Sequence, residues 1–183
     1  MGISPSVHQC SAQIVCAPEN RALFSTLCNI IEQLPGLFAN LDADGTRRLG
    51  ENRNLSSATD KTFFAPTNRA FSRLSGLFDF KNKAFTQDEK LVLKQLIQVH
   101  IIGGGVVQTY EELECNETLR NLNGKLIEIR CAENRKGIEV KYVVGDPGLV
   151  VNFDANSAKI TDSNNAIAKN GIIHAINNVV WQN

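Results

Sequence analysis

The sequence of this chain predicts an α+β fold. Apolar residues recur at helical spacing in the first half of the chain, whereas from about residue 119 onward they recur at roughly every second position. The pattern shows no repeated alternation of strand and helix, which a doubly wound sheet requires. With 183 residues and 43% hydrophobic content, the chain is long enough to bury one sizeable core. We therefore predict one domain over residues 19–183, preceded by an N-terminal extension over residues 1–18.

The first predicted helix starts at Pro18 and ends at Pro35, because apolar residues recur at helical spacing between these two prolines. Residues 42–60 are polar and are expected to form a long exposed loop. The start of this loop, Asp42-Ala43-Asp44-Gly45, resembles a calcium loop but lacks the further acidic or amide ligand and the closing glutamate. A solvated loop is therefore the preferred interpretation, and no metal ligand is assigned.

The next segment carries two helix starts. A short apolar strand over residues 61–65 is expected to stop at Pro66, after which Thr67 caps a brief helix. A longer helix begins at the capping box formed by Thr86 and Glu89. Three glycines at 103–105 end this pattern as a turn, and the remainder of the chain is expected to be mainly strand. Residues 116–130 are expected to form a hairpin around Asn123-Gly124.

The cysteines favour disulfides. The chain has five cysteines, and none stands in the C-x-x-C spacing of a zinc site or a redox motif. Cys115 and Cys131 flank the predicted hairpin, so we predict a bridge between them. Cys10, Cys16 and Cys28 supply thiols for one further bridge and leave one cysteine free or paired between chains. The alternative is a reduced protein in which all five cysteines are small, buried apolar residues.

Two patterns for N-glycosylation, at Asn54 and Asn116, agree with secretion. The predicted location is therefore secreted or at the cell surface. The Met1-Gly2 start, with Ser6 at the sixth place, also fits N-myristoylation, whereas a start methionine in place of a removed signal peptide is an equally simple account. Since no apolar run approaches the roughly 20 residues that span a bilayer, no transmembrane segment is predicted.

Charge and motifs exclude several classes of function. Nineteen basic residues balance nineteen acidic ones, so nucleic acid is not an expected partner. The sequence has no G-x-S-x-G, H-E-x-x-H or Walker motif, and we predict no enzymatic activity, no catalytic residues and no cofactor. His100 and His174 each stand within an apolar run, and both are expected to be buried structural residues rather than ligands.

Three segments resemble the fasciclin domain family. Residues 62–71 fit nine of the ten places of its first signature, through Thr62, Phe64, Ala65, Pro66, Thr67, Asn68 and Phe71 among others. Residues 170–180 resemble its second signature through Asn170, Gly171 and His174. Between them, residues 96–102 resemble the family's central tyrosine-histidine segment around His100, with Val99 where tyrosine commonly stands.

This resemblance implies a wedge of β-sheet flanked by helices, found in secreted and surface proteins that mediate adhesion. It implies structural roles for the signature residues: Phe64 and Phe71 in the core, and Asn170-Gly171 at the turn into the last strand. The tyrosine-histidine segment has been linked to integrin-mediated adhesion in animal members. Because Val99 replaces the tyrosine, that role is not carried over to this chain.

The expected function is cell adhesion or matrix interaction, through protein–protein or glycan contacts with a cell-surface or matrix partner or with a second copy of the chain. Two alternatives stay open: a small-ligand-binding protein or enzyme with a pocket near His100, and a matrix component assembled by disulfides through the odd cysteine. Residues 42–60 and 103–112 are the segments expected to be most exposed for contact.

Overall fold

The computed structural model describes residues 11–34, 60–74, 76, 78–80, 84–145, 157–161, 166–168 and 170–181. The helical elements are α1 (Ser11–Cys16), the 3-10 helix η1 (Pro18–Asn20), α2 (Arg21–Gln33), α4 (Asn68–Ser72) and α5 (Gln87–Val99). The strands are β1 (Lys61–Pro66), β2 (Ile101–Ile102), β3 (Thr118–Arg120), β4 (Leu126–Glu133), β5 (Glu139–Gly145), β6 (Ser157–Lys159), β7 (Ala166–Ala168) and β8 (Gly171–Ile176). All described helices lie before β2, with β1 alone inserted between α2 and α4, and the predicted α+β class is confirmed.

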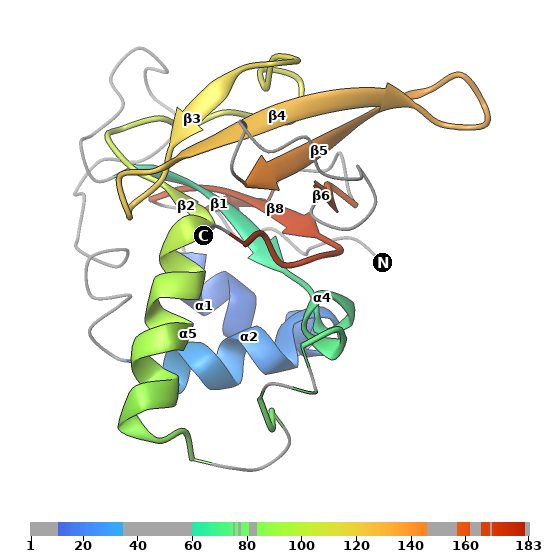
Figure 1. Cartoon of the computed structure of the whole chain (residues 1–183). Coiled ribbons are helices and arrows are strands. Elements are labelled where there is room, and N and C mark those ends of the chain that lie inside the picture. The colour runs from blue at the N-terminus through green and yellow to red at the C-terminus, as the bar shows by residue number, and fades with distance from the viewer. Residues whose placement is uncertain are drawn as a thin grey trace.

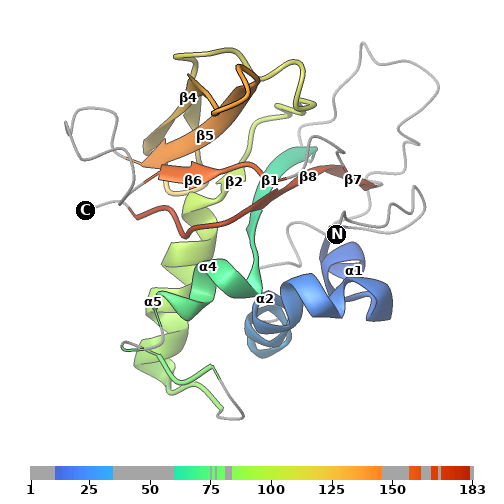
Figure 2. The same cartoon turned by 90° about the vertical axis from the view of Figure 1, so that its right-hand side faces the viewer.

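The described strands form two four-stranded sheets. One has the order β2-β1-β8-β7 and the other β3-β4-β5-β6. Neighbouring strands run antiparallel in every pair except β1 and β8, which are parallel. Figure 1 shows the second sheet stacked on one side of the first, with α1, α2, α4 and α5 on its other side. Figure 2 shows the same layers from a perpendicular direction.

The first sheet is the middle layer, so its two central strands are buried on both faces. Every residue of β1 and β8 is buried. Phe63 and Ile173 belong to the core that faces the helices, whereas Phe64 and Ile176 belong to the core between the sheets. Successive strand residues point to opposite faces, so a strand covered on both sides needs apolar residues at consecutive positions. This explains why residues 61–66 lack simple alternation.

The predicted helix caps are confirmed. The side chain of Thr67 accepts a hydrogen bond from the backbone N–H of Ala70 at the start of α4. Thr86 and Glu89 form the complete capping box of α5, with each side chain bonded to the other's backbone N–H. Both signals are local in sequence, and each fixes where its helix begins.

Two hairpins extend the second sheet. The predicted turn at Asn123-Gly124 joins β3 to β4, and Gly124 has the positive φ of 75° that the turn needs. The β4–β5 hairpin carries seven paired positions and projects beyond the helical layer on the side away from α5 (Figure 1). Its connecting loop includes the exposed side chain of Ile138.

The expectation that residues 103–112 are strongly exposed is wrong for most of this segment, because residues 105–110 are half-buried. The hydroxyl of Thr62 donates to the carbonyl of Val106, and the backbone N–H of Gln108 donates to that hydroxyl. These two hydrogen bonds hold the segment around Val106 and Gln108 against β1. Of the predicted exposed loop at 42–60, only Asp60 is described, and it is buried, so the expected exposure is wrong at this position. The rest of that loop with its calcium-like start, Asn54, Cys10 and the Met1-Gly2 start all lie outside the described residues.

Candidate interaction site beside His100

The two signature segments lie side by side as β1 and β8. Their parallel register places Phe64 opposite His174, and the two rings stack with centroids 5.4 Å apart and an interplanar angle of 24°. Phe64 and Phe71 are each at most 1% exposed, as the resemblance implies, and Ala65 is buried as well. The signatures therefore build the centre of the fold, and most of their side chains are buried.

The turn before β8 brings the backbone of Gly171 close to the backbone of Lys61. Gly171 has a φ of 149°, and a Cβ atom at this position would lie 1.9 Å from the carbonyl oxygen of Lys61. Beside it, the side-chain oxygen of Asn170 accepts hydrogen bonds from the backbone N–H and the hydroxyl of Ser11, both 3.0 Å long. The Asn-Gly pair of the second signature thus connects β7, β8, β1 and α1, and only glycine fits its second place.

His100 joins the end of α5 to the C-terminal segment. Its Nδ1 lies 2.7 Å from the carbonyl oxygen of Leu96, and its Nε2 accepts a 2.9 Å hydrogen bond from the backbone N–H of Val180. Because Nε2 accepts, Nδ1 must carry the proton and donate to Leu96. Both ring nitrogens are occupied by backbone partners, and the side chain is 1% exposed. The predicted structural role of His100 agrees with this geometry.

The two described histidines are neutral at physiological pH. Burial lowers the pKa of His100 to about 4 against the opposing effect of the Leu96 carbonyl. Burial also lowers the pKa of His174 to about 4, although its hydrogen bond to the Gln108 carbonyl and the charge of Glu111 act in the other direction. The Nε2 of His174 lies 2.8 Å from that carbonyl, while its Nδ1 is buried with no hydrogen-bond partner among the described residues.

A groove of about 410 Å³, lined by polar and apolar side chains, lies beside His100. One wall is a stripe of α5, and the other consists of the C-terminal segment and the β3–β4 turn. The apolar lining residues are Val92, Leu96, Val99, Val180 and Trp181. His100 is not itself a lining residue. It bonds to the backbone of Leu96 in one wall and of Val180 in the other, so it connects the two walls. Val99, which replaces the family's common tyrosine, is part of this lining.

The polar lining residues are Gln95, Asn123 and Lys125. The side-chain amide of Asn123 donates to the carbonyl oxygen of Gln95 at 3.0 Å, which links the β3–β4 turn to α5. Among the described lining residues, Lys125 alone is charged. Trp181, the single tryptophan of the chain, is 39% exposed and Val92 is 42% exposed. The groove therefore exposes two apolar side chains, those of Val92 and Trp181, beside polar ones, whereas Leu96, Val99 and Val180 are almost fully buried.

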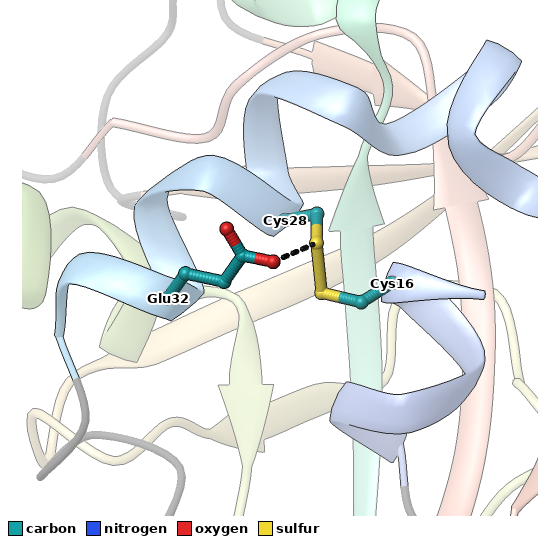
Figure 3. Close-up of side chains that lie close together, drawn as sticks. All are labelled: Cys16, Cys28 and Glu32. Carbon is teal, nitrogen blue, oxygen red and sulfur yellow. Dashed lines mark hydrogen bonds between the residues drawn. A yellow bond between two sulfur atoms is a disulfide. The ribbon is translucent and has the colours of Figure 1, made fainter. Parts of the chain in front are cut away.

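Two disulfides close loops within the fold. One joins Cys115 to Cys131, the pair predicted from the hairpin, and the other joins Cys16 to Cys28. A glutamate lies beside each bridge: Glu32 Oε1 is 3.5 Å from Sγ of Cys28, as Figure 3 shows. Glu139 has the same relationship to the other bridge. Thiolates bind metal ions, and bridged sulfurs are not thiolates, so neither group forms a metal site while its disulfide is intact.

Sequence reasoning missed the residues that form the groove. It singled out His100, which lies behind the groove, but not Val92, Lys125 or Trp181. One signal was available in the sequence. Val92 stands on the polar face of the predicted helix, where an exposed apolar side chain covers no core. The predicted acceptor Asn116 is exposed, with a positive φ of 66°.

Comparison with known proteins identifies the family. The family model of the fasciclin domain matches residues 22–182. No curated protein matches the chain. Within the described residues, none of the helices combines the length and the hydropathy that crossing a bilayer requires.

A solved structure of a FAS1 domain pair from the insect cell adhesion molecule fasciclin I is similar to this chain. The TM-score is 0.62 at 14% sequence identity, so the likeness concerns the fold. The match covers 94% of this chain and 51% of the solved one, and the chain thus spans about half the length of that structure. Since the family model also covers both signature segments and the strands that they form, the chain belongs to the fasciclin domain family, which is associated with cell adhesion.

Proposed function

We propose that the chain is an extracellular adhesion module that works by binding other macromolecules, and that it catalyses no reaction. The observation that carries this proposal is the groove beside His100, at which the side chains of Val92 and Trp181 are exposed, on a domain whose family is associated with cell adhesion. Monomeric proteins rarely expose grouped apolar side chains without a binding role. Because polar and apolar side chains both line the groove, its lining fits a protein or a glycan partner.

The disulfides support a location outside the cell or at its surface. Bridges at Cys16–Cys28 and Cys115–Cys131 persist in oxidising compartments and are rare in the cytosol. The exposed position of Asn116 leaves its side chain accessible for N-glycosylation. We propose secretion and glycosylation at Asn116 on this basis, and a shift in electrophoretic mobility after glycosidase treatment of protein from a secreting host is the corresponding test.

Adhesion is tested with beads coated with the purified protein, because multivalent display makes weak contacts measurable. The beads are mixed with one another and with surfaces that carry cell-derived matrix, and heat-denatured protein serves as the control. Clumping of coated beads supports homophilic contact, and retention on matrix supports a heterophilic partner. Beads that neither clump nor adhere, with folded protein on their surface, contradict the proposed function.

A second candidate is a small-ligand-binding protein. It is favoured by the groove volume of about 410 Å³, which falls within the range of ligand pockets. Catalysis by His100 is not part of this candidate, because both of its ring nitrogens bond to the backbone. The disulfide-linked matrix component stays a prediction that depends on Cys10, and non-reducing electrophoresis tests it by the presence or absence of a covalent dimer.

A further inference from the structure

The disulfide of the second sheet has a setting that suits chemistry as well as stability. We propose that the Cys115–Cys131 bridge is a thiol-exchange site, at which a positively charged thiol bonds to Cys115 and releases Cys131. The thiol is either a small molecule or a partner's cysteine flanked by basic residues. This activity goes beyond the proposed adhesion, and it depends on the bridge and its neighbours rather than on the groove.

The two bridges differ in access. Cys115 is exposed and Cys131 is half-buried, whereas in the other bridge Cys16 is half-buried and Cys28 is only 4% exposed. An incoming thiolate must reach one sulfur of the bridge that it opens, and exposed disulfides are the more labile ones. Cys115 is therefore the sulfur that is attacked, and exchange is selective for its bridge.

Lys141 favours the departure of Cys131. The two residues stand opposite each other in the register of β4 and β5, and Lys141 is 6% exposed. Its Nζ donates hydrogen bonds of 2.7 and 2.6 Å to the carbonyl oxygens of Tyr110 and Leu113, which are both uncharged acceptors. A cation near a cysteine stabilises its thiolate, and a sulfur leaves faster when its thiolate is stabilised. Cys131 is therefore the leaving sulfur.

The exchange step balances without an outside oxidant or reductant. The incoming thiol loses its proton to solvent, and its sulfur then bonds to Sγ of Cys115. The bond between the two cysteines breaks, and its electron pair stays on Sγ of Cys131, which takes up a proton from solvent. The products are a mixed disulfide at Cys115 and a free thiol at Cys131, so the incoming thiol is the one co-reactant.

Carboxylates around Cys115 select the charge of the thiol. Oε2 of Glu139 lies 3.7 Å from Sγ of Cys115. Glu114 directly precedes Cys115 and is exposed, and Glu117 follows two residues later. Negative charge at the point of attack repels an anionic thiol and raises the local concentration of a cationic one. The preferred reactant is therefore a thiol that carries positive charge.

The surrounding backbone stays in place when the bridge opens. The N–H of Asn116 donates a 2.6 Å hydrogen bond to the carbonyl of Ile129, and the N–H of Ile129 donates a 2.8 Å bond to the carbonyl of Glu117. These bonds hold the chain beside Cys115 against β4 independently of the sulfurs. Cys131 thus remains within reach of the mixed disulfide and can close the bridge again, which makes the exchange reversible.

The test compares two small thiols of opposite charge, cysteamine and thioglycolate, on the intact chain at equal thiolate concentration. Acid stops the exchange, free thiols are alkylated, and unreduced peptides are mapped by mass spectrometry. Cysteamine is expected on Cys115 and the alkyl group on Cys131, and this bridge should open about tenfold faster than Cys16–Cys28.

Rates with a small uncharged disulfide correct for the different reactivities of the two thiols. After this correction cysteamine should react about threefold faster than thioglycolate, and about 1 M salt should remove the difference. A tripeptide with cysteine between two lysines provides the second source of thiol. Reaction with the tripeptide shows that the site accepts a protein cysteine, and reaction with cysteamine alone confines it to small thiols.

Variants test the origin of the charge preference. Glu139→Gln should reduce the advantage of cysteamine, because it removes the carboxylate nearest to Sγ of Cys115. Glu32→Gln makes the same change beside the other bridge and should leave that advantage unchanged. Thermal unfolding of both variants verifies that the fold is retained.

Three outcomes would overturn the inference. They are cysteamine on Cys131 instead of Cys115, equal rates of opening for the two bridges, and corrected rates that are the same for thioglycolate and cysteamine. The adhesion of coated beads is measured without added thiol. Beads that adhere while the exchange test fails therefore leave the proposed function standing and remove only this activity.

Discussion

The backbone N–H of Val180 donates a 2.9 Å hydrogen bond to Nε2 of His100. This bond joins residues 80 positions apart in sequence and holds the C-terminal segment against the end of α5. Together with the bond from Nδ1 to the Leu96 carbonyl, it makes a buried imidazole the connection between the two walls of the groove. The stability of the fold and the shape of the groove therefore depend on the same side chain.

His100→Leu should destabilise the protein by about 3 kcal/mol, because it leaves the Leu96 carbonyl and the Val180 N–H buried without partners. Urea unfolding at neutral pH measures the loss. The emission of Trp181 should also change in the folded variant, since Val180 directly precedes it. A loss below about 1 kcal/mol would show that the two bonds contribute little.

Stability should fall as the pH drops from about 6.5 towards 4. His100 and His174 each have a pKa of about 4 in the folded protein, against 6.5 for an unperturbed histidine, so the unfolded chain binds more protons in this window. Each histidine should cost about 2 kcal/mol of stability by pH 5, and the full contribution is present above pH 6.5. Urea unfolding at pH 5, 6 and 7 measures this slope.

Nitrogen NMR of the imidazoles provides the control for that experiment. At pH 7 the proton should reside on Nδ1 of His100, which donates to Leu96, and on Nε2 of His174, which donates to Gln108. Neither ring should titrate above pH 5. A stability that stays constant between pH 7 and pH 5, or either ring titrating near its unperturbed value, would contradict the account.

Gly171→Ala should prevent or severely impair folding, at a cost of about 4 kcal/mol or more, because the added Cβ would overlap the backbone of Lys61. Gly137→Ala is the matched comparison. Gly137 also has a positive φ, of 71°, but no heavy atom lies within 4 Å of its added Cβ, so about 1 kcal/mol is expected. Equal losses in the two variants, measured by thermal unfolding, would argue against the close approach of β1 and β8.

Removing the Cys115–Cys131 bridge by double substitution to alanine should lower stability by about 3 kcal/mol, given a sequence separation of 16 residues. The bridge limits the freedom of the unfolded chain around the β3–β4 hairpin. Urea unfolding checks this value, and mapping of disulfide-linked peptides checks the pairing itself. A pairing of either cysteine with Cys10 would contradict the structure.

Local signals made much of the fold predictable. Thr67 and Glu89 belong to caps whose partners lie three residues away, and the turn at Gly124 depends on a single positive φ. The pairing of β1 with β8 was not predictable from periodicity, because strands buried on both faces show no alternation, and the partners stand about 110 residues apart in sequence. Only the resemblance connected these two segments to one domain.

The candidate site was less predictable, because it combines residues from three distant parts of the chain. Val92 comes from α5, Lys125 from the β3–β4 turn and Trp181 from the C-terminal segment. Composition also misled the prediction for residues 103–112. Glycines and polar residues there indicated exposure, yet the Thr62 hydroxyl accepts a hydrogen bond from the backbone N–H of Gln108 and donates one to the carbonyl of Val106, which holds much of the segment half-buried beside β1.

The central claim is that the protein adheres to its partner through the groove beside His100. Beads coated with the unaltered protein, with Val92→Glu and with Ile138→Glu, at equal density, measure this most directly on cell-derived matrix and against one another. The account predicts that the Ile138→Glu beads adhere like the unaltered protein and that adhesion of the Val92→Glu beads falls about tenfold. Adhesion of Val92→Glu beads equal to that of the unaltered protein would contradict the claim.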